Sequence, residues 1–192
     1  MAEILVARSE LILGGQKSGK SRRAETLAQT WLSGGANRRA ILVATGQPWD
    51  DEMRERIARH QRERAERVQG MTTLEEPLRL SEMLLRNSTA DTLLVVDCLT
   101  LWLTNWMMPA SGEAALPQAF EAAADGLCDA VTRAPGPVVL VGNEIGLGVI
   151  PLGREVRAFV DTLGRLNQRV AQACSRVTFM AAGLPLTLKD QP

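Results

Sequence analysis

A glycine-rich segment near the start of the chain constrains its fold more than any other feature. Residues 14–21 are GGQKSGKS, which matches the pattern G-x-x-x-x-G-K-S. An apolar run at residues 11–13 precedes the segment, and RRAETLA, a good helix former, follows it. Between a strand and a helix, such a loop turns backbone amides and the positive end of the helix dipole toward a phosphate. The motif therefore predicts that the chain binds a nucleoside triphosphate. The candidate contacts are Gly14, Gly15, Gln16, Lys17, Ser18, Gly19, Lys20 and Ser21.

Two side chains of this loop and one later aspartate are candidate catalytic and metal-binding groups. Lys20 would reach the β- and γ-phosphates, and the hydroxyl of Ser21 would bind Mg²⁺. Asp97 follows the apolar run LLVV, a strand pattern that supplies the second magnesium ligand in many kinases and ATPases. An aspartate at a strand end can also cap the next helix. Beside a phosphate loop we predict the metal role, with Ser21 and Asp97 as ligands. The guanine-reading motif N-K-x-D is absent from the sequence, which disfavours a switch GTPase.

Short apolar runs alternate along the chain with segments of helical spacing. The runs lie at residues 11–13, 40–44, 93–96, 138–141 and 177–182. This alternation predicts a mostly parallel sheet, and continuously apolar strands favour helices on both of its faces. Residues 186–188 follow the last run after only Gly183, Leu184 and Pro185, which predicts an antiparallel hairpin at the sheet edge. We expect one α/β domain over residues 1–192, a three-layer P-loop NTPase fold of the RecA-like type.

Composition disfavours several kinds of partner and location. Lysine and arginine number 22 and so do aspartate and glutamate, so no overall positive charge attracts nucleic acid. Cys98, Cys128 and Cys174 are widely spaced, which predicts reduced thiols rather than disulfides or a zinc site. No apolar stretch is long enough to span a membrane, and the first residues lack the pattern of a secretory signal. We expect a cytoplasmic protein.

The only histidine, His60, lies in a segment rich in arginine and glutamate. With Asp50 as a candidate N-cap, the segment predicts a helix in which His60 shares a face with an apolar stripe. A histidine of this kind is more often packed or solvated than catalytic, and arginines here also form i, i+4 pairs with glutamates. Yet Arg59, Arg62 and Arg64 would neutralise a triphosphate while an imidazole nitrogen attacks it. The pattern alone leaves both interpretations open.

Four blocks of sequence together resemble one known family. They are LILGGQKSGKSRRAE, ILVATGQPWDDEMRERIARH, LLVVDCLTLWLTN and VVLVGNEIGLGVIPLGREVRAFVDTLGRLNQRVA. Their least generic parts are N-E-x-G-x-G-x-x-P at residues 143–151 and G-R-x-N-Q-R at residues 164–169. The chain resembles the bifunctional adenosylcobinamide kinase/adenosylcobinamide-phosphate guanylyltransferases of cobalamin biosynthesis.

The resemblance implies two reactions at one nucleotide site. The γ-phosphoryl group of GTP or ATP would pass to a hydroxyl of adenosylcobinamide, and GMP from GTP would then join adenosylcobinamide phosphate to give adenosylcobinamide-GDP. The family's guanylylated histidine matches His60, which would be catalytic together with Lys20, and the resemblance further implies Mg²⁺ and a homotrimer. Additional candidate GTP contacts by resemblance are Ala44, Thr45, Gly46, Gln61, Arg62, Glu63, Arg64 and Glu75.

The sequence departs from the family pattern in one segment. Members commonly have proline and tryptophan where this chain has Ala65 and Met71, and we expect a longer loop over residues 64–75. Two other functions fit the phosphate loop: a small-molecule kinase in which His60 is structural, and a RecA-like ATPase that serves as a nucleic-acid or assembly module. The zero net charge argues against the latter.

Overall fold

The computed structural model describes residues 5–48, 51–109 and 115–191, whose strands form one seven-stranded sheet in the order β3-β2-β4-β5-β1-β6-β7. Neighbouring strands run parallel except β6 and β7. The strands are β1 (Ser9–Gly14), β2 (Arg39–Ala44), β3 (Met71–Glu75), β4 (Thr92–Asp97), β5 (Val138–Val141), β6 (Arg176–Ala181) and β7 (Leu184–Asp190). The helices are α1 (Lys20–Ser33), α2 (Asp51–Arg67), α3 (Leu80–Asn87), α4 (Leu99–Met107), α5 (Pro117–Arg133) and α6 (Arg154–Ala173). Within α2, the side chains not described are those of Met53, Arg56, Ile57, His60, Gln61, Arg64 and Ala65.

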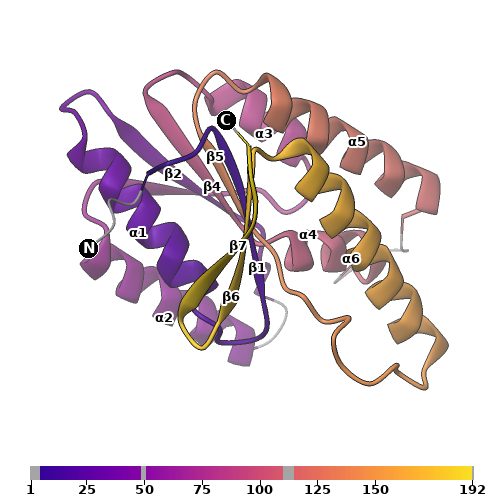
Figure 1. Cartoon of the computed structure of the whole chain (residues 1–192). Coiled ribbons are helices and arrows are strands. Elements are labelled where there is room, and N and C mark those ends of the chain that lie inside the picture. The colour runs from indigo at the N-terminus through magenta and orange to yellow at the C-terminus, as the bar shows by residue number, and fades with distance from the viewer. Residues whose placement is uncertain (1–4, 49–50, 110–114, 192) are drawn as a thin grey trace.

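Helices cover both faces of the sheet, with α1 and α2 on one side and α3, α4, α5 and α6 on the other (Figure 1). The central strands carry runs of consecutive apolar residues because successive side chains point to opposite faces, both of which are covered by helices. In β1, Ile12 packs with α1, whereas Leu11 and Leu13 belong to the core beneath α4, α5 and α6. The largest buried side chain of that second core is Trp102 of α4. The expected three-layer α/β fold is confirmed.

The segment between α2 and β3 differs from the loop expected over residues 64–75. Helix α2 continues to Arg67, and residues 71–75 form β3, so only residues 68–70 connect the two elements. Strand β3 pairs only with β2 in the described sheet and exposes most of its side chains. An edge strand with the sequence MTTLE lacks the continuous apolar run that marks the central strands, so the expectation of a loop was wrong.

The predicted hairpin closes the sheet at the edge formed by β6 and β7. Its turn is shorter than expected, because β7 already begins at Leu184. The turn residues Ala182 and Gly183 have φ of 51° and 79°, the left-handed conformation of tight hairpin turns. Pro185 is tolerated in β7 because an edge strand does not need every N–H group. The N–H of Gly183 donates to the carbonyl of Ser18 at 3.0 Å, so this turn contacts the loop after β1.

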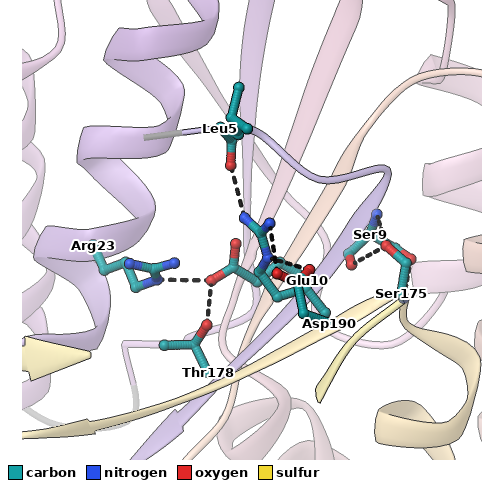
Figure 2. Close-up of polar contacts among 8 residues, drawn as sticks. Leu5, Ser9, Glu10, Arg23, Ser175, Thr178 and Asp190 are labelled. Atoms are coloured by element: carbon teal, nitrogen blue, oxygen red, sulfur yellow. Dashed lines mark hydrogen bonds and ion pairs between the residues drawn. The ribbon is translucent and has the colours of Figure 1, made fainter. Parts of the chain in front are cut away.

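A buried carboxylate joins β1 to the elements on either side of it (Figure 2). Glu10 is fully buried, and its Oε1 accepts hydrogen bonds from Arg23 Nε at 2.7 Å and from Thr178 Oγ1 at 2.8 Å. Arg23 lies in the first turn of α1 and Thr178 in β6. Nearby, Arg176 pairs with Asp190, which connects β6 to β7. The contacts of Glu10 therefore hold the start of α1 against the central strand.

The three cysteines are free thiols, as expected. Burial raises the pKa of Cys98 and that of Cys174 to about 12, so both remain protonated near neutral pH. In the described part of the chain, no helix combines the length and apolar character that a membrane span requires.

Candidate active site

A cleft of about 1000 Å³ lies at the carboxyl edge of the parallel strands. Residues 16–22 line it after β1, and Ala44, Glu75 and Asp97 line it at the ends of β2, β3 and β4. Asn143 contributes from the segment after β5. The carboxyl ends of parallel strands meet at one edge of a sheet, which is where α/β proteins bind ligands. The strand order thus brings together residues that are far apart in the sequence.

The loop after β1 has the backbone conformation of a phosphate cradle. Gly14, Lys17 and Gly19 have φ of 150°, 54° and 101°, and the N–H of Ser18 donates to the carbonyl of Gly15 at 3.3 Å. A Cβ atom added to Gly14 would lie 2.4 Å from the carbonyl oxygen of Met180 in β6. Glycine at position 14 is therefore required both by φ and by the close approach of the neighbouring strand.

Lys20 places its ammonium group inside this loop. Its Nζ donates to the carbonyl of Gly15 at 2.6 Å, and the side chain is largely buried. Burial lowers the pKa of Lys20 from its usual value, while the negative charge of Asp97 opposes that shift. A buried ammonium gains much from an anionic partner because water solvates it poorly. The position of Lys20 therefore favours a phosphate in the loop.

Ser21 and Asp97 form the pair of oxygen groups that the sequence predicts as magnesium ligands. Ser21 Oγ donates to Asp97 Oδ2 at 3.2 Å, which joins the start of α1 to the end of β4. Hydroxyl and carboxylate oxygens are hard donors that suit Mg²⁺, which takes its remaining ligands from water and substrate phosphates. The described residues hold no cluster of three or more His, Cys, Asp or Glu side chains arranged for a metal. The pair fits a nucleotide-bound magnesium ion rather than a closed protein site.

Helix α2 forms a further part of the wall of the cleft that the phosphate loop lines. The residues that line the cleft from α2 follow helical spacing, and they are Glu52, Glu55, Arg59, Glu63 and Arg67. The Arg67 guanidinium pairs with Glu63 at 3.2 Å and with Glu25 of α1 at 3.3 Å, so the end of α2 is fixed to α1. This wall carries both carboxylates and guanidinium groups.

The predicted catalytic histidine belongs to the same helix. His60 follows Arg59 in α2, but its side chain lies outside the part of the chain that the structure describes, as do those of Gln61 and Arg64. The candidate N-cap Asp50 also lies outside the described residues. Arg62 is exposed and does not line the cleft.

The structure places most of the other predicted contacts at the cleft. Gln16, Lys17, Ser18, Gly19, Lys20, Ser21, Ala44, Gly46, Glu63, Glu75 and Asp97 line it, whereas Gly14, Gly15 and Thr45 do not. Thr45 is fully buried, where its Oγ1 donates to the Cys98 carbonyl at 2.7 Å and accepts from the Cys98 N–H at 2.8 Å. Thr45 thus joins the ends of β2 and β4 beneath the cleft.

Two asparagines that support the cleft were given no role from the sequence, although Asn167 lies in the motif at residues 164–169. Asn105 of α4 donates from Nδ2 to the carbonyls of Thr45 and Pro77 at 2.8 and 3.0 Å. Asn167 of α6 donates to the carbonyl of Asn143 at 3.1 Å. Both are buried, and a buried amide on an otherwise apolar helix face is the signal that would have identified them.

Two solved structures resemble the whole fold at low sequence identity. A protein of Pyrococcus horikoshii OT3 matches with a TM-score of 0.53 and 10% identity, covering 97% of this chain and 88% of its own. The flagellar accessory protein FlaH of Methanocaldococcus jannaschii matches with a TM-score of 0.52 and 11% identity, covering 98% and 80%. These similarities support the three-layer α/β fold and nothing more specific.

Sequence comparisons are far more specific. Residues 10–188 match the model of the family described as cobinamide kinase / cobinamide phosphate guanyltransferase. The bifunctional adenosylcobalamin biosynthesis protein CobP of Pseudomonas aeruginosa is 46% identical over 183 residues, which are 95% of this chain and 98% of the relative. The bifunctional adenosylcobalamin biosynthesis protein CobU of Escherichia coli is 34% identical over 187 residues, which are 93% and 98% of the two chains. The chain therefore belongs to the cobinamide kinase/cobinamide phosphate guanyltransferase family of bifunctional enzymes.

Proposed function

We propose that this chain phosphorylates adenosylcobinamide with GTP or ATP and then transfers GMP from GTP to the product through a guanylylated His60. Family membership supports the two activities. The observation that carries the nucleotide chemistry is a single cleft that both the phosphate loop and α2, the helix of His60, line. A nucleotide in this cleft would have its phosphates near both elements.

In the kinase step the loop holds the donor while a hydroxyl of the corrinoid attacks the γ-phosphorus. The backbone amides of residues 16–21 bind the phosphates, and Lys20 stabilises the negative charge on the transferring group. Ser21 and Asp97 would hold Mg²⁺, which draws charge from the phosphate oxygens when it is bound. The bond from the γ-phosphorus to the bridging oxygen breaks, the nucleoside diphosphate leaves, and the proton of the attacking hydroxyl passes to water.

In the transferase step a ring nitrogen of His60 attacks the α-phosphorus of GTP. A P–N bond forms and pyrophosphate leaves, with Lys20 and Arg59 offsetting its charge. A phosphate oxygen of adenosylcobinamide phosphate then attacks the same phosphorus. The P–N bond breaks, the product adenosylcobinamide-GDP forms, and His60 returns to its neutral state for the next cycle.

Incubation with GTP labelled at the α-phosphate tests the covalent step. We expect one acid-labile, alkali-stable label per chain in the wild type and none in His60→Ala. Arg54→Ala is a matched control, because Arg54 lies on the same helix, is exposed, and does not line the cleft. Full labelling of His60→Ala would refute the assignment of the nucleophile. Cobinamide phosphorylation without any label in the wild type would support the plain kinase instead.

A further inference from the structure

The segment between β5 and α6 exposes an unusual run of apolar side chains. Residues 145–152, IGLGVIPL, contain no charged or hydrogen-bonding side chain, and we call them the rim loop. Leu147, Val149 and Leu152 are 78%, 96% and 97% exposed. Single exposed apolar residues are common on soluble proteins, but a contiguous exposed group marks a surface that binds something.

The rim loop is held in place at both of its ends. At the start, the Asn143 N–H donates to Thr100 Oγ1 at 3.0 Å, and the Asn143 carbonyl accepts a hydrogen bond from Asn167 Nδ2. The Glu144 N–H donates to the carbonyl of Gly14 at 3.1 Å, directly before the phosphate loop. At the other end, Arg157 Nη1 of α6 donates to the carbonyl of Pro151 at 2.9 Å. The apolar side chains thus extend from an anchored segment.

These anchors place the start of the rim loop beside the nucleotide cleft. Asn143, two residues before the loop, lines the cleft. The segment after β5 leaves the sheet at the same edge as the turn between β6 and β7, which contacts the phosphate loop (Figure 1). The cleft itself is lined mainly by charged and polar side chains, which suit a nucleotide. A large acceptor with apolar faces would find matching surface on the rim loop rather than within the cleft.

We propose that the rim loop binds the corrin ring of the cobinamide acceptor and directs its hydroxyl-bearing arm toward the γ-phosphate in the cleft. The inference rests on the proposed function, from which the acceptor is taken. A corrin is a broad macrocycle with methyl groups on its faces and neutral amides at its periphery, so its recognition requires apolar contact area without charge. Leu147, Val149 and Leu152 supply that area.

Substitution of an exposed leucine on the rim loop tests the proposal. Leu147→Ser removes apolar contact area without disturbing the core, so we expect KM for cobinamide to rise on the order of tenfold while kcat and the affinity for GTP stay near the wild-type values. Leu147→Met keeps an apolar side chain of similar size and should restore most of the affinity. Leu85→Ser on α3, where the leucine is 47% exposed and does not line the cleft, is the matched control.

Two further measurements distinguish the alternatives. Equilibrium dialysis in the absence of nucleotide measures the binding of cobinamide to the protein directly, with the visible absorbance of cobinamide as the readout. Weaker binding of cobinamide by Leu147→Ser supports the rim-loop proposal. That support does not depend on the labelling experiment, because a wild type that takes no label from GTP would overturn only the guanylylated intermediate. Unchanged dialysis and an unchanged KM would overturn the rim-loop proposal. A lower molecular mass of Leu147→Ser in light scattering would overturn it too, because the loop would then be a contact between copies of the chain.

Discussion

Removal of Arg23 should destabilise the protein more than removal of its buried partner Glu10. The Glu10 side chain is fully buried and that of Arg23 is 16% exposed. In Arg23→Met the carboxylate keeps only the hydrogen bond from Thr178, and its Oε2 already has no partner among the described residues. Leaving one member of a buried pair without its partner costs about 3–5 kcal/mol, so we expect a loss of about 3–4 kcal/mol in the free energy of unfolding.

The reverse substitution leaves a cation that can reach water. In Glu10→Met, Arg23 can turn its guanidinium to solvent, and Thr178 loses one hydrogen bond, so we expect a loss of about 1–2 kcal/mol. The double variant should be no less stable than Glu10→Met alone, because no unpaired carboxylate remains. Adding Glu10→Met to Arg23→Met should therefore restore about 2 kcal/mol.

Equilibrium unfolding in urea, followed by tryptophan fluorescence at one fixed protein concentration, measures all four proteins. Two results would contradict this prediction. One is a double variant whose loss in the free energy of unfolding equals the sum of the two single losses, and the other is a larger loss for Glu10→Met than for Arg23→Met. Either result would show that burial of the unpaired carboxylate does not determine the stability of this cluster.

Four further predictions concern the cleft and the thiols. Because burial lowers the pKa of Lys20, GTP affinity in fluorescence titrations should fall as pH rises through that lowered pKa, and a flat profile up to its usual pKa would contradict this. Asp97→Asn should weaken GTP binding about tenfold with Mg²⁺ and little with EDTA, and equal losses in both conditions would argue against a metal ligand. Gly14→Ala should cost about 2–4 kcal/mol in urea unfolding, because its Cβ would overlap the Met180 carbonyl; unchanged stability would show that the strand can move aside. With a pKa of about 12, Cys98 has on the order of one thiolate in ten thousand at pH 8. Iodoacetamide should therefore modify the half-buried Cys128 first, and mass spectrometry that finds Cys98 modified earlier would contradict that order.

The fold could be predicted where one physical signal dominates. Buried central strands such as β4 and β5 must be apolar on both faces, so their sequences mark them directly. Strand β3 gives no such signal, because an edge strand can satisfy its backbone groups with water and keep polar side chains such as Thr72 and Thr73. The tight turn at Ala182 and Gly183 was missed because Pro185 suggested a longer connection.

The candidate site was predictable where a motif fixes local geometry. The loop of residues 14–21 and Asp97 could be paired from sequence because each directly follows an apolar strand, and Ser21 contacts Asp97 in the structure. The burial of Thr45 and the supporting roles of Asn105 and Asn167 depend on how helices pack over the sheet. Local spacing carries no information about contacts between residues so far apart in the chain.

The contacts of the phosphate loop can be completed only late in the synthesis of the chain. The loop is translated among the first residues, yet β1 pairs with β5 and β6, and Ser18 accepts its hydrogen bond from Gly183. A nascent chain that ends before β5 contains β2, β3 and β4 but neither neighbour of β1. A ribosome must therefore release nearly the whole polypeptide before the phosphate loop gains all of its contacts.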